Sequence, residues 1–273
     1  MGTLYIVGTP IGNMEDITLR ALRVLREVTL IAAEDTRTTG RLLQHHGIET
    51  PLTSYHDFSD ETRLHELVER LHSADVALVS DAGMPGLSDP GYRLVQAAHD
   101  AGIPVSPIPG PSAAITALVS SGLPTDSFLF LGFLPRQQAG RRAALEEVRE
   151  RPYTLVLYEA PHRLLKLLAD VETVLGNRTL VVARELTKLY EELWRGTASE
   201  AQTYFARDRV RGEITVVVEG ASAAELVWDE AAVRNALRDA IARGQSRKEA
   251  AAAVAARSGW RKKELYELSL HLD

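Results

Sequence analysis

The sequence Val79-Ser80-Asp81-Ala82-Gly83-Met84-Pro85-Gly86-Leu87-Ser88-Asp89-Pro90-Gly91 joins an apolar run at 76–79, typical of a buried strand, to a helical pattern that begins near Tyr92. Glycine lets backbone approach a ligand closely, proline fixes the shape of a loop, and Ser and Asp supply polar contacts. A single loop of this kind can equally be a tight structural turn. Because ligands of open α/β sheets sit at the carboxyl ends of strands, several such loops favour a binding site in an α/β fold.

The composition is that of a globular protein without disulfides. The 273 residues are 45% hydrophobic and 25% charged, and they suffice for two domains of ordinary size. No apolar stretch approaches the roughly 20 residues of a membrane span. The N-terminus has no basic segment ahead of an apolar one, so we expect neither membrane nor signal peptide. The absence of cysteine fits a cytoplasmic location and excludes thiolate metal sites.

Charge is unevenly distributed along the chain. The net charge of -6 argues against a generally basic nucleic-acid binder. Residues 228–273, however, carry nine Arg and Lys against seven Asp and Glu. If the protein binds a polyanion, local patches must therefore do it.

Strand and helix patterns alternate along the chain, which predicts largely parallel sheets with helical crossovers. The expected strands cover 4–7, 30–33, 76–80, 104–108, 128–131, 153–158, 179–183 and 214–218. The expected helices cover 16–27, 38–46, 60–73, 92–101, 112–121, 139–150, 162–175 and 198–206. We predict two α/β domains, 1–124 and 125–226, because Leu123-Pro124-Thr125-Asp126 breaks one helix before a new strand.

The remainder of the chain, 227–273, is expected to be a small all-helical unit. Residues 221–226 are interpreted as the linker that precedes it. Ser246 is followed three residues later by Glu249, which is the pattern of a capping box at a helix start.

Three more expected strands end in loops with unusual chemistry. They are Pro109-Gly110-Pro111-Ser112-Ala113-Ala114, Tyr158-Glu159-Ala160-Pro161-His162-Arg163 and Ala183-Arg184-Glu185-Leu186-Thr187-Lys188. In the first, small Ser112 and Ala113 leave room for a flat ligand near a helix start. Since the loops are divided between both expected domains, a cleft shared by the two domains is the economical explanation.

Simpler interpretations stay open for these motifs. Glu159 and Arg163, four residues apart, can form a mere surface ion pair worth well under ~1 kcal/mol, and 184–188 can be a solvated strand exit. His45, His46 and His162 show no metal-ligand spacing and are interpreted as surface or capping residues. Neither a nucleophile elbow nor a Walker phosphate loop is present in the sequence.

The first loop, Gly8-Thr9-Pro10-Ile11-Gly12-Asn13, occupies the place of a dinucleotide-binding loop. The acidic pair Glu34-Asp35 follows roughly 20 residues later, as that motif requires. Proline replaces its second glycine and the third is out of register, while Glu15 would repel a pyrophosphate at the helix start. A nicotinamide cofactor is therefore disfavoured.

Taken together, the motifs resemble the class III S-adenosylmethionine-dependent methyltransferases of the tetrapyrrole-methylase fold. More narrowly they resemble the bacterial branch that methylates a cytidine 2′-hydroxyl in small-subunit ribosomal RNA. The resemblance runs in family order along nearly the whole chain. It is carried by 7–13, Ala33-Glu34-Asp35-Thr36-Arg37, Ser80-Asp81-Ala82-Gly83, Ser88-Asp89-Pro90-Gly91, 109–113, Leu157 to Arg163 and 183–188.

The resemblance implies two α/β domains with the methyl donor, S-adenosylmethionine, in the cleft between them, and usually a homodimer. It implies a cytidine near the decoding centre of the small ribosomal subunit as substrate. The helical tail resembles the family's helix-turn-helix-like domain. Carried over by position, the donor contacts are Pro10, Ser80, Asp81, Ala82, Met84, Ser112, Ala113, Glu159 and Ala183.

The expected reaction is in-line transfer of a methyl group to a ribose hydroxyl, in which the enzyme aligns the nucleophile and excludes water. A general base can add about 10²–10⁴-fold, and the candidates at the cleft are Asp35, Glu159, Glu185 and Lys188. Glu159 and Lys188 are favoured, the lysine only if its pKa is lowered. No metal is expected. The candidates for RNA phosphate contacts are Arg37, Arg163, Arg184, Arg247, Lys248, Arg261, Lys262 and Lys263.

Two other functions remain open from the sequence. A methyltransferase of the same fold acting on a porphyrinoid or a protein side chain predicts an apolar, roomy acceptor cleft. A non-enzymatic RNA-binding assembly module predicts no donor binding and a function that depends entirely on 229–273. The paired loops make the assembly module the weaker of the two.

Overall fold

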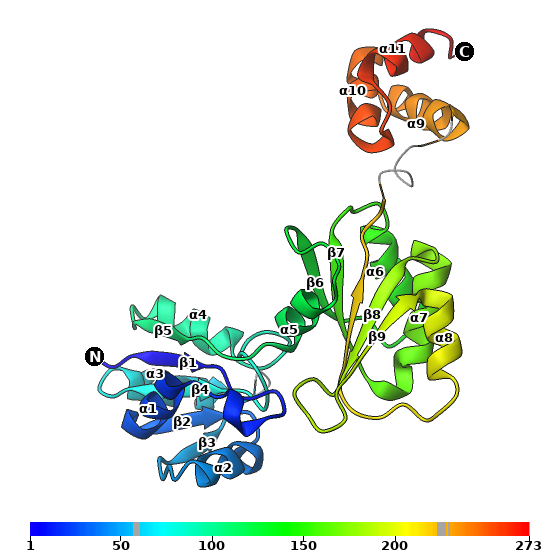
Figure 1. The fold of residues 1–273 in the computed structure, drawn as a ribbon. Coiled ribbons are helices and arrows are strands. Elements are labelled where there is room, and N and C mark those ends of the chain that lie inside the picture. The colour runs from blue at the N-terminus through cyan, green and yellow to red at the C-terminus, as the bar shows by residue number, and fades with distance from the viewer. Residues whose placement is uncertain (57–60, 223–227, 229, 273) are drawn as a thin grey trace.

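The computed structural model describes residues 1–56, 61–222, 228 and 230–272. Two α/β units, each built on a five-stranded sheet, are followed by a separate group of three helices (Figure 1). This confirms the predicted fold class. Within the described ranges, no helix is both long and apolar enough to span a membrane.

The first sheet is entirely parallel, as predicted, with the order β3-β2-β4-β1-β5. Its strands are β1 Leu4–Val7, β2 Leu30–Ala33, β3 Leu52–Ser54, β4 Val76–Val79 and β5 Val105–Ile108. The connections hold η1 Met14–Asp16, α1 Leu19–Glu27, α2 Thr36–His45, α3 Glu61–Leu71 and α4 Tyr92–Asp100. All loops that follow the strands therefore emerge at one carboxyl edge.

Helices cover both faces of this sheet, which explains why its strands are continuous apolar runs. On one face, α1 and α2 bury Leu25 and Leu42 against Ile31 and Val79. On the other, α3 and α4 bury side chains such as Leu67 and Leu94 against Leu4 and Leu78. Alternate residues of each strand thus feed two separate cores.

The second sheet is mixed, with the order β6-β7-β10-β8-β9. Its strands are β6 Phe128–Phe133, β7 Thr154–Glu159, β8 Thr179–Arg184, β9 Glu192–Thr197 and β10 Ile214–Val218. β10 lies between β7 and β8 and runs antiparallel to both, and β9 pairs antiparallel with β8. Only β6 and β7 pair in parallel. The prediction of a largely parallel sheet is wrong for this half of the chain.

The mixed sheet follows from the connections. β8 continues into β9 through the short segment 185–191, which is an antiparallel hairpin connection. The apolar run at β10 specifies burial on both faces but not a direction. α8, Ala198–Phe205, leads into β10, which then enters the sheet antiparallel to its neighbours. The prediction also lacks β9, a half-polar edge strand, and β3, which has only three residues.

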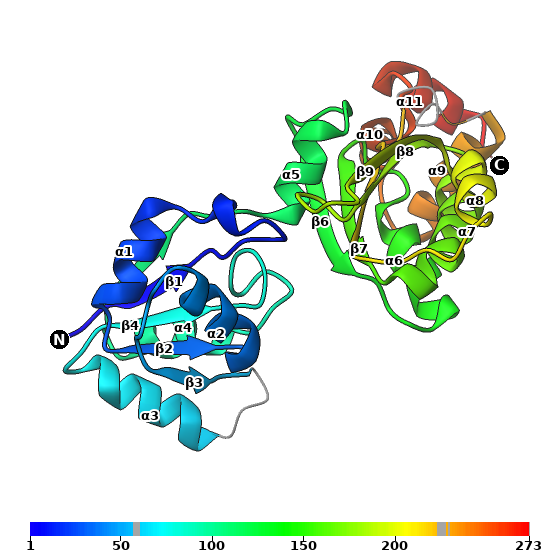
Figure 2. The same cartoon turned by 60° about the horizontal axis from the view of Figure 1, so that its bottom comes forward.

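Helices again cover both faces of the second sheet (Figure 2). The helices η2 Pro161–Arg163, α6 Gln138–Val148, α7 Leu164–Leu175 and α8 lie in its connections, and α6, α7 and α8 pack on one face. The opposite face is covered by α5, Ala113–Ser120, whose Ala117 and Leu118 contact Val181 and Val217. By packing, α5 belongs with the second sheet although it precedes the predicted boundary at 124.

The helical unit consists of α9 Glu230–Ala242, α10 Arg247–Ser258 and α11 Lys262–Leu270. It has its own small core, in which Val233, Val254 and Leu265 are buried. The predicted start of α10 is confirmed, because Ser246 caps the amide of Glu249 and the Glu249 carboxylate accepts from the Ser246 amide. Of the predicted helix 60–73 and linker 221–226, residues 60 and 223–226 lie outside the described residues.

Loss of this cap gives the first testable prediction. Ser246→Ala removes the two bonds of the Ser246 hydroxyl, to the Glu249 amide and to the Glu249 carboxylate, so we expect the helical unit to lose about 1 kcal/mol of stability. Hydrogen exchange of the α10 amides measures the loss. The matched control is Ser120→Ala on α5, whose hydroxyl donates within its own helix and which should leave α10 unchanged. Equal protection in both variants would contradict the role of the cap.

Candidate active site

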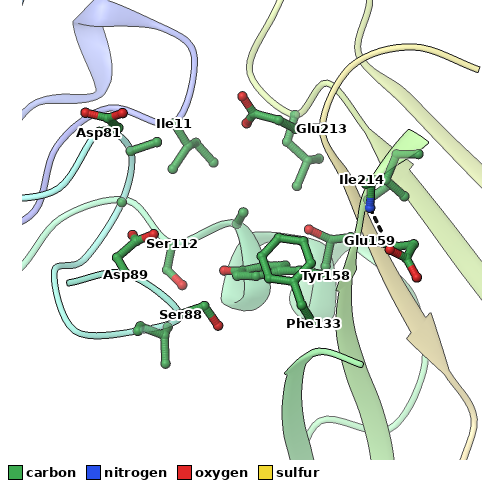
Figure 3. A pocket seen from close by; sticks show the side chains of 18 of the residues that line it. Ile11, Asp81, Ser88, Asp89, Ser112, Phe133, Tyr158, Glu159, Glu213 and Ile214 are labelled. Atoms are coloured by element: carbon green, nitrogen blue, oxygen red, sulfur yellow. Dashed lines mark hydrogen bonds between the residues drawn. The ribbon is translucent and has the colours of Figure 1, made fainter. Parts of the chain in front are cut away.

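The loop edges of the two sheets face each other across a cavity of about 350 Å³ (Figure 3). This lies within the size range of small-molecule sites. β10 runs antiparallel, so its first residues stand beside the carboxyl ends of β7 and β8 at the same edge. The cavity lining comprises Ile11, Glu34, Asp81, Ala82, Gly83, Met84, Leu87, Ser88, Asp89, Ser112, Ala113, Phe133, Tyr158, Glu159, Ala160, Pro161, Ala183, Leu186, Gly212, Glu213, Ile214 and Thr215.

The predicted donor residues converge on this cavity. Seven of the nine line it directly, and the remaining two, Pro10 and Ser80, line an adjoining cavity of about 190 Å³. Asp81 and Ala82 line both cavities. The expectation of one cleft shared by two domains therefore agrees with the geometry.

The loops of the first domain are held by backbone contacts that need small residues. Thr9 and Gly83 form an isolated bridge, and the Thr9 hydroxyl donates to the Ser80 carbonyl at 3.1 Å. A Cβ placed on Gly8 would lie 2.7 Å from the Cα of Gly110, so neither loop tolerates a side chain there. Ser88 adopts a left-handed φ of 64°, which turns the loop toward the second domain.

Acidic side chains gather on the first-domain side of the cavity. The Asp81 carboxylate accepts from the Asp35 amide at 3.1 Å, and Glu34 accepts from the Asp81 amide at 3.2 Å. Burial raises the pKa of both Glu34 and Asp81. Burial, followed by the nearby charge of Glu34, raises the pKa of Asp89 to about 6. This side of the cavity is therefore acidic.

Glu159 ends β7 at the opposite wall. Its residue is only 2% exposed, so the interpretation as a surface ion pair is wrong. One carboxylate oxygen accepts from the Ala160 amide at 2.8 Å and lies 3.0 Å from Arg163 Nε. The other oxygen, Oε2, is buried without a hydrogen-bond partner in the described part of the chain. Burial raises the pKa of Glu159, although the Ala160 amide and Arg163 partly offset this.

Lys188 lies beside the adjoining cavity with two carboxylates. Its ammonium is 3.0 Å from both Glu185 Oε1 and Glu213 Oε1. Burial alone would lower the pKa of Lys188, but its bonds to Glu213 and Glu185 raise it above the ordinary value. The condition set for Lys188 as a base, a lowered pKa, is not met. A Cβ on Gly12 would lie 2.4 Å from Lys188 Cγ. Lys188 therefore also packs closely against the first domain at Gly12.

The other two predicted bases are also poor proton acceptors. Hydrogen bonds from the Arg37 side chain and amide hold the pKa of Asp35 far below its usual range. Burial raises the pKa of Glu185, but the Glu213 amide and Lys188 outweigh it and leave that pKa lowered. Of the three carboxylate candidates, only Glu159 has a raised pKa.

The three arginines predicted at the cleft differ in their surroundings. Arg37 is exposed and forms an ion pair with Asp35 at 2.7 Å. Arg163 is largely buried and donates to the Leu134 carbonyl at 2.8 Å, and Arg184 is paired with Glu192 at 2.8 Å. The tail candidates lie on the helical unit, beyond the second domain and away from the cavity (Figure 1); they are Arg247, Lys248, Arg261, Lys262 and Lys263, all exposed.

Sequence reasoning did not single out several residues that line the cavity. Asp89 stood in the quoted loop, and only its burial marks it as chemically unusual. Tyr158 accepts from the Ala114 amide at 3.3 Å and so joins β7 to the first turn of α5. Glu213 comes from a segment with no motif of its own. Among the described residues, no three His, Asp or Glu side chains gather closely enough to hold a metal ion.

Comparison with known proteins identifies the family. The tetrapyrrole (corrin/porphyrin) methylases match residues 3–202. The chain belongs to this family. It is 48% identical to the ribosomal RNA small subunit methyltransferase I of Synechocystis, over 100% of this chain and 99% of the relative. Its counterpart from Bacillus subtilis is 44% identical over 98% of this chain and 94% of the relative. The resemblance inferred from the motifs is therefore confirmed.

Solved structures agree on the fold. A uroporphyrin-III-C-methyltransferase from Thermus thermophilus has a TM-score of 0.55 at 24% identity, covering 80% of this chain and 94% of that one. A diphthine synthase has a TM-score of 0.64 at 16% identity, covering 80% and 90%. Both matches leave about a fifth of this chain outside the superposition, and they support the fold alone.

Proposed function

We propose that the protein transfers a methyl group from S-adenosylmethionine to the 2′-hydroxyl of a cytidine in small-subunit ribosomal RNA near the decoding centre. The carrying observation is the interdomain cavity formed by the motif loops, in a chain that aligns end to end with relatives named for this RNA. The solved structures of enzymes with other names share the fold with this chain, and this similarity supports the fold but not the acceptor. The small ribosomal subunit is thus the proposed partner, and the cytoplasm the proposed location.

The cavity suits this donor on two counts. Glu34, Asp81 and Asp89 are acidic lining residues whose negative charge would attract a sulfonium and an ammonium. The buried Oε2 of Glu159 has no partner in the described residues and offers an acceptor for a donor group of the ligands. When bound, the donor supplies a methyl group on a positively charged sulfur that leaves readily. We propose no metal.

Glu159 is the proposed proton acceptor. It would accept the proton of the ribose hydroxyl on Oε2, once substrate binding exposes this atom, as the hydroxyl oxygen takes the methyl group that the donor supplies. A pKa raised toward the working pH suits a general base. Lys188 lines the adjoining cavity and is paired with Glu185, and Asp35 is paired with Arg37. Phe133 and Leu186 line the main cavity, where they help to exclude water.

A transfer assay tests the function. Purified protein is incubated with methyl-labelled S-adenosylmethionine and small ribosomal subunits, and the RNA is digested to nucleosides. We expect label in 2′-O-methylcytidine. Label in a base or in protein, or donor binding without transfer, would overturn the proposed acceptor.

The acidic wall gives a pH prediction for donor binding. Asp89 is ionised above its pKa of about 6 and then attracts the cationic donor. We expect donor affinity to fall between pH 7.5 and 5.5 in the wild type, and less steeply in Asp89→Asn. Calorimetric titration of the donor measures both slopes; parallel slopes would remove Asp89 from this role. Asp100→Asn, on the far end of α4, is the control.

Phosphate contacts by Arg37 and by the five tail cations complete the proposal, together with Arg163 and Arg184 where RNA binding frees them.

We also propose a homodimer. Leu189 and Tyr190 are 87% and 70% exposed in a loop fixed by the Glu191 carboxylate, which accepts from the Thr187 amide at 2.6 Å. Ordered apolar side chains of this kind favour a protein contact. Sedimentation equilibrium of wild type and Leu189→Asp measures it.

A further inference from the structure

A segment outside the cavity carries an unexplained series of arginines. Between α8 and β10 the chain places Arg207, Arg209 and Arg211 at every second position, and all three are exposed. Val210 points the other way and packs against the core of the second domain. Arg209 and Arg211, the neighbours of Val210 along the chain, are instead exposed. We call these three residues the arginine segment.

The positive charges of the arginine segment are not neutralised by ion pairs within the described residues. Arg209 and Arg211 make no hydrogen bond or ion pair within the described residues, whereas Arg184 nearby is neutralised by Glu192. Arg207 lies over the Tyr204 ring, 5.8 Å from its centroid, and leaves its hydrogen-bond donors free for another partner. Exposed cations next to an aromatic ring are the usual elements of a single-strand nucleic-acid surface.

A third cavity opens beside the arginine segment. It measures about 360 Å³ and is lined by Arg184, Glu192, Tyr204, Phe205, Arg207, Asp208, Arg209 and Val210. Of its two acids, Glu192 is occupied, accepting from Arg184 at 2.8 Å and from the Tyr204 hydroxyl at 2.7 Å. Three arginines against two carboxylates leave the lining net positive.

The arginine segment also leads to the site of methyl transfer. Gly212 and Glu213, which follow Arg211 directly, line the interdomain cavity. In Figure 1 this connection runs along the lower rim of the second domain from α8 toward the first domain. Residues two apart in a chain can be separated by up to roughly 7 Å, which is comparable with successive phosphates of one nucleic-acid strand.

From these observations we infer that Arg207, Arg209 and Arg211 bind consecutive phosphates of a single-stranded RNA segment that flanks the target nucleotide and guide it into the interdomain cavity. The inference rests on the proposed function and names further residues for it. Because the contacts are to phosphate, they set the position of the strand and not its sequence.

The test compares Arg207→Gln/Arg209→Gln/Arg211→Gln with a control of equal charge change, Arg23→Gln/Arg63→Gln/Arg149→Gln, whose arginines are exposed elsewhere. We expect the first variant to raise the KM for small subunits by about 10-fold to 100-fold, with donor affinity and kcat unchanged. The slope of the logarithm of the binding constant against the logarithm of salt concentration should become shallower by about 2, because three contacts to a single strand are lost. Arg207→Lys/Arg209→Lys/Arg211→Lys, which keeps the three positive charges, should recover most of the affinity for small subunits.

Each outcome separates the two proposals. If the wild type does not methylate small subunits, the proposed function fails. If it does, and the arginine-segment variant has the KM and the salt dependence of the control, the arginine segment is not an RNA contact. A reduced kcat with unchanged KM would equally overturn the inference.

Discussion

Glu159→Gln is expected to lower methyl transfer by about 10²–10⁴-fold, the range that a general base contributes. The amide keeps the shape of the side chain and can still accept from the Ala160 amide, so the fold should survive. It cannot take the proton of the ribose hydroxyl. Single-turnover methylation at saturating donor measures the loss. Calorimetric titration of the donor measures separately any change in donor affinity, because a Gln oxygen that accepts from the Ala160 amide leaves an NH2 group at the position of Oε2.

The pH profile distinguishes a base from a merely structural residue. The wild-type rate should fall as pH drops through the pKa of Glu159, which burial places above the ordinary glutamate range. Glu159→Gln should lack this limb. Glu185→Gln is the matched control, because it alters a carboxylate of the same cleft whose pKa is lowered. Comparable rates in both variants would remove Glu159 from the chemistry.

The largest expected effect on stability is at Asp170. This carboxylate is fully buried between α6 and α7, where it accepts from Arg141 Nε at 2.7 Å, Arg142 Nε at 2.6 Å and Gln138 at 3.2 Å. Arg141 is itself only 2% exposed. Asp170→Ala leaves this guanidinium buried and unpaired, so we expect a loss of about 3–5 kcal/mol in the free energy of unfolding.

Urea unfolding of the variant measures this loss. The control is Glu146→Ala on α6, which removes an exposed partner of Arg149 and should cost less than about 1 kcal/mol. Burial raises the pKa of Asp170, but bonds from Arg142 and Arg141 outweigh it and leave the pKa lowered. Its contribution is therefore present above the unfolded pKa and is lost as pH falls through the folded pKa. A cost at Asp170 no greater than at Glu146 would contradict the account.

The parts of the site that the sequence predicted are those with local causes. Glycine, proline and small residues report on backbone shape directly, so the loops at 79–91 and 109–114 were recognisable as ligand loops. Their order along the chain then identified the family. The first domain followed as well, because a parallel sheet buried on both faces produces continuous apolar runs such as β4.

What the sequence missed depends on contacts between distant segments. The raised pKa of Lys188 depends on Glu213, 25 positions away and without a motif. The direction of β10 depends on the end of the sheet at which the chain arrives after α8, and not on the five apolar residues of β10. α5 has apolar residues on most of its surface, and packing alone decides that Ala117 faces the second sheet while Val119 stays 66% exposed. Asp89 looked like a turn residue until its burial was known.

The central claim is that the interdomain cavity holds the methyl donor, and a crystal structure with S-adenosylhomocysteine tests it most directly. The account predicts the product in the cavity, with its amino-acid end toward Asp81 and Asp89. Density for the product at any other place on the protein, with this cavity filled by solvent, would contradict the account.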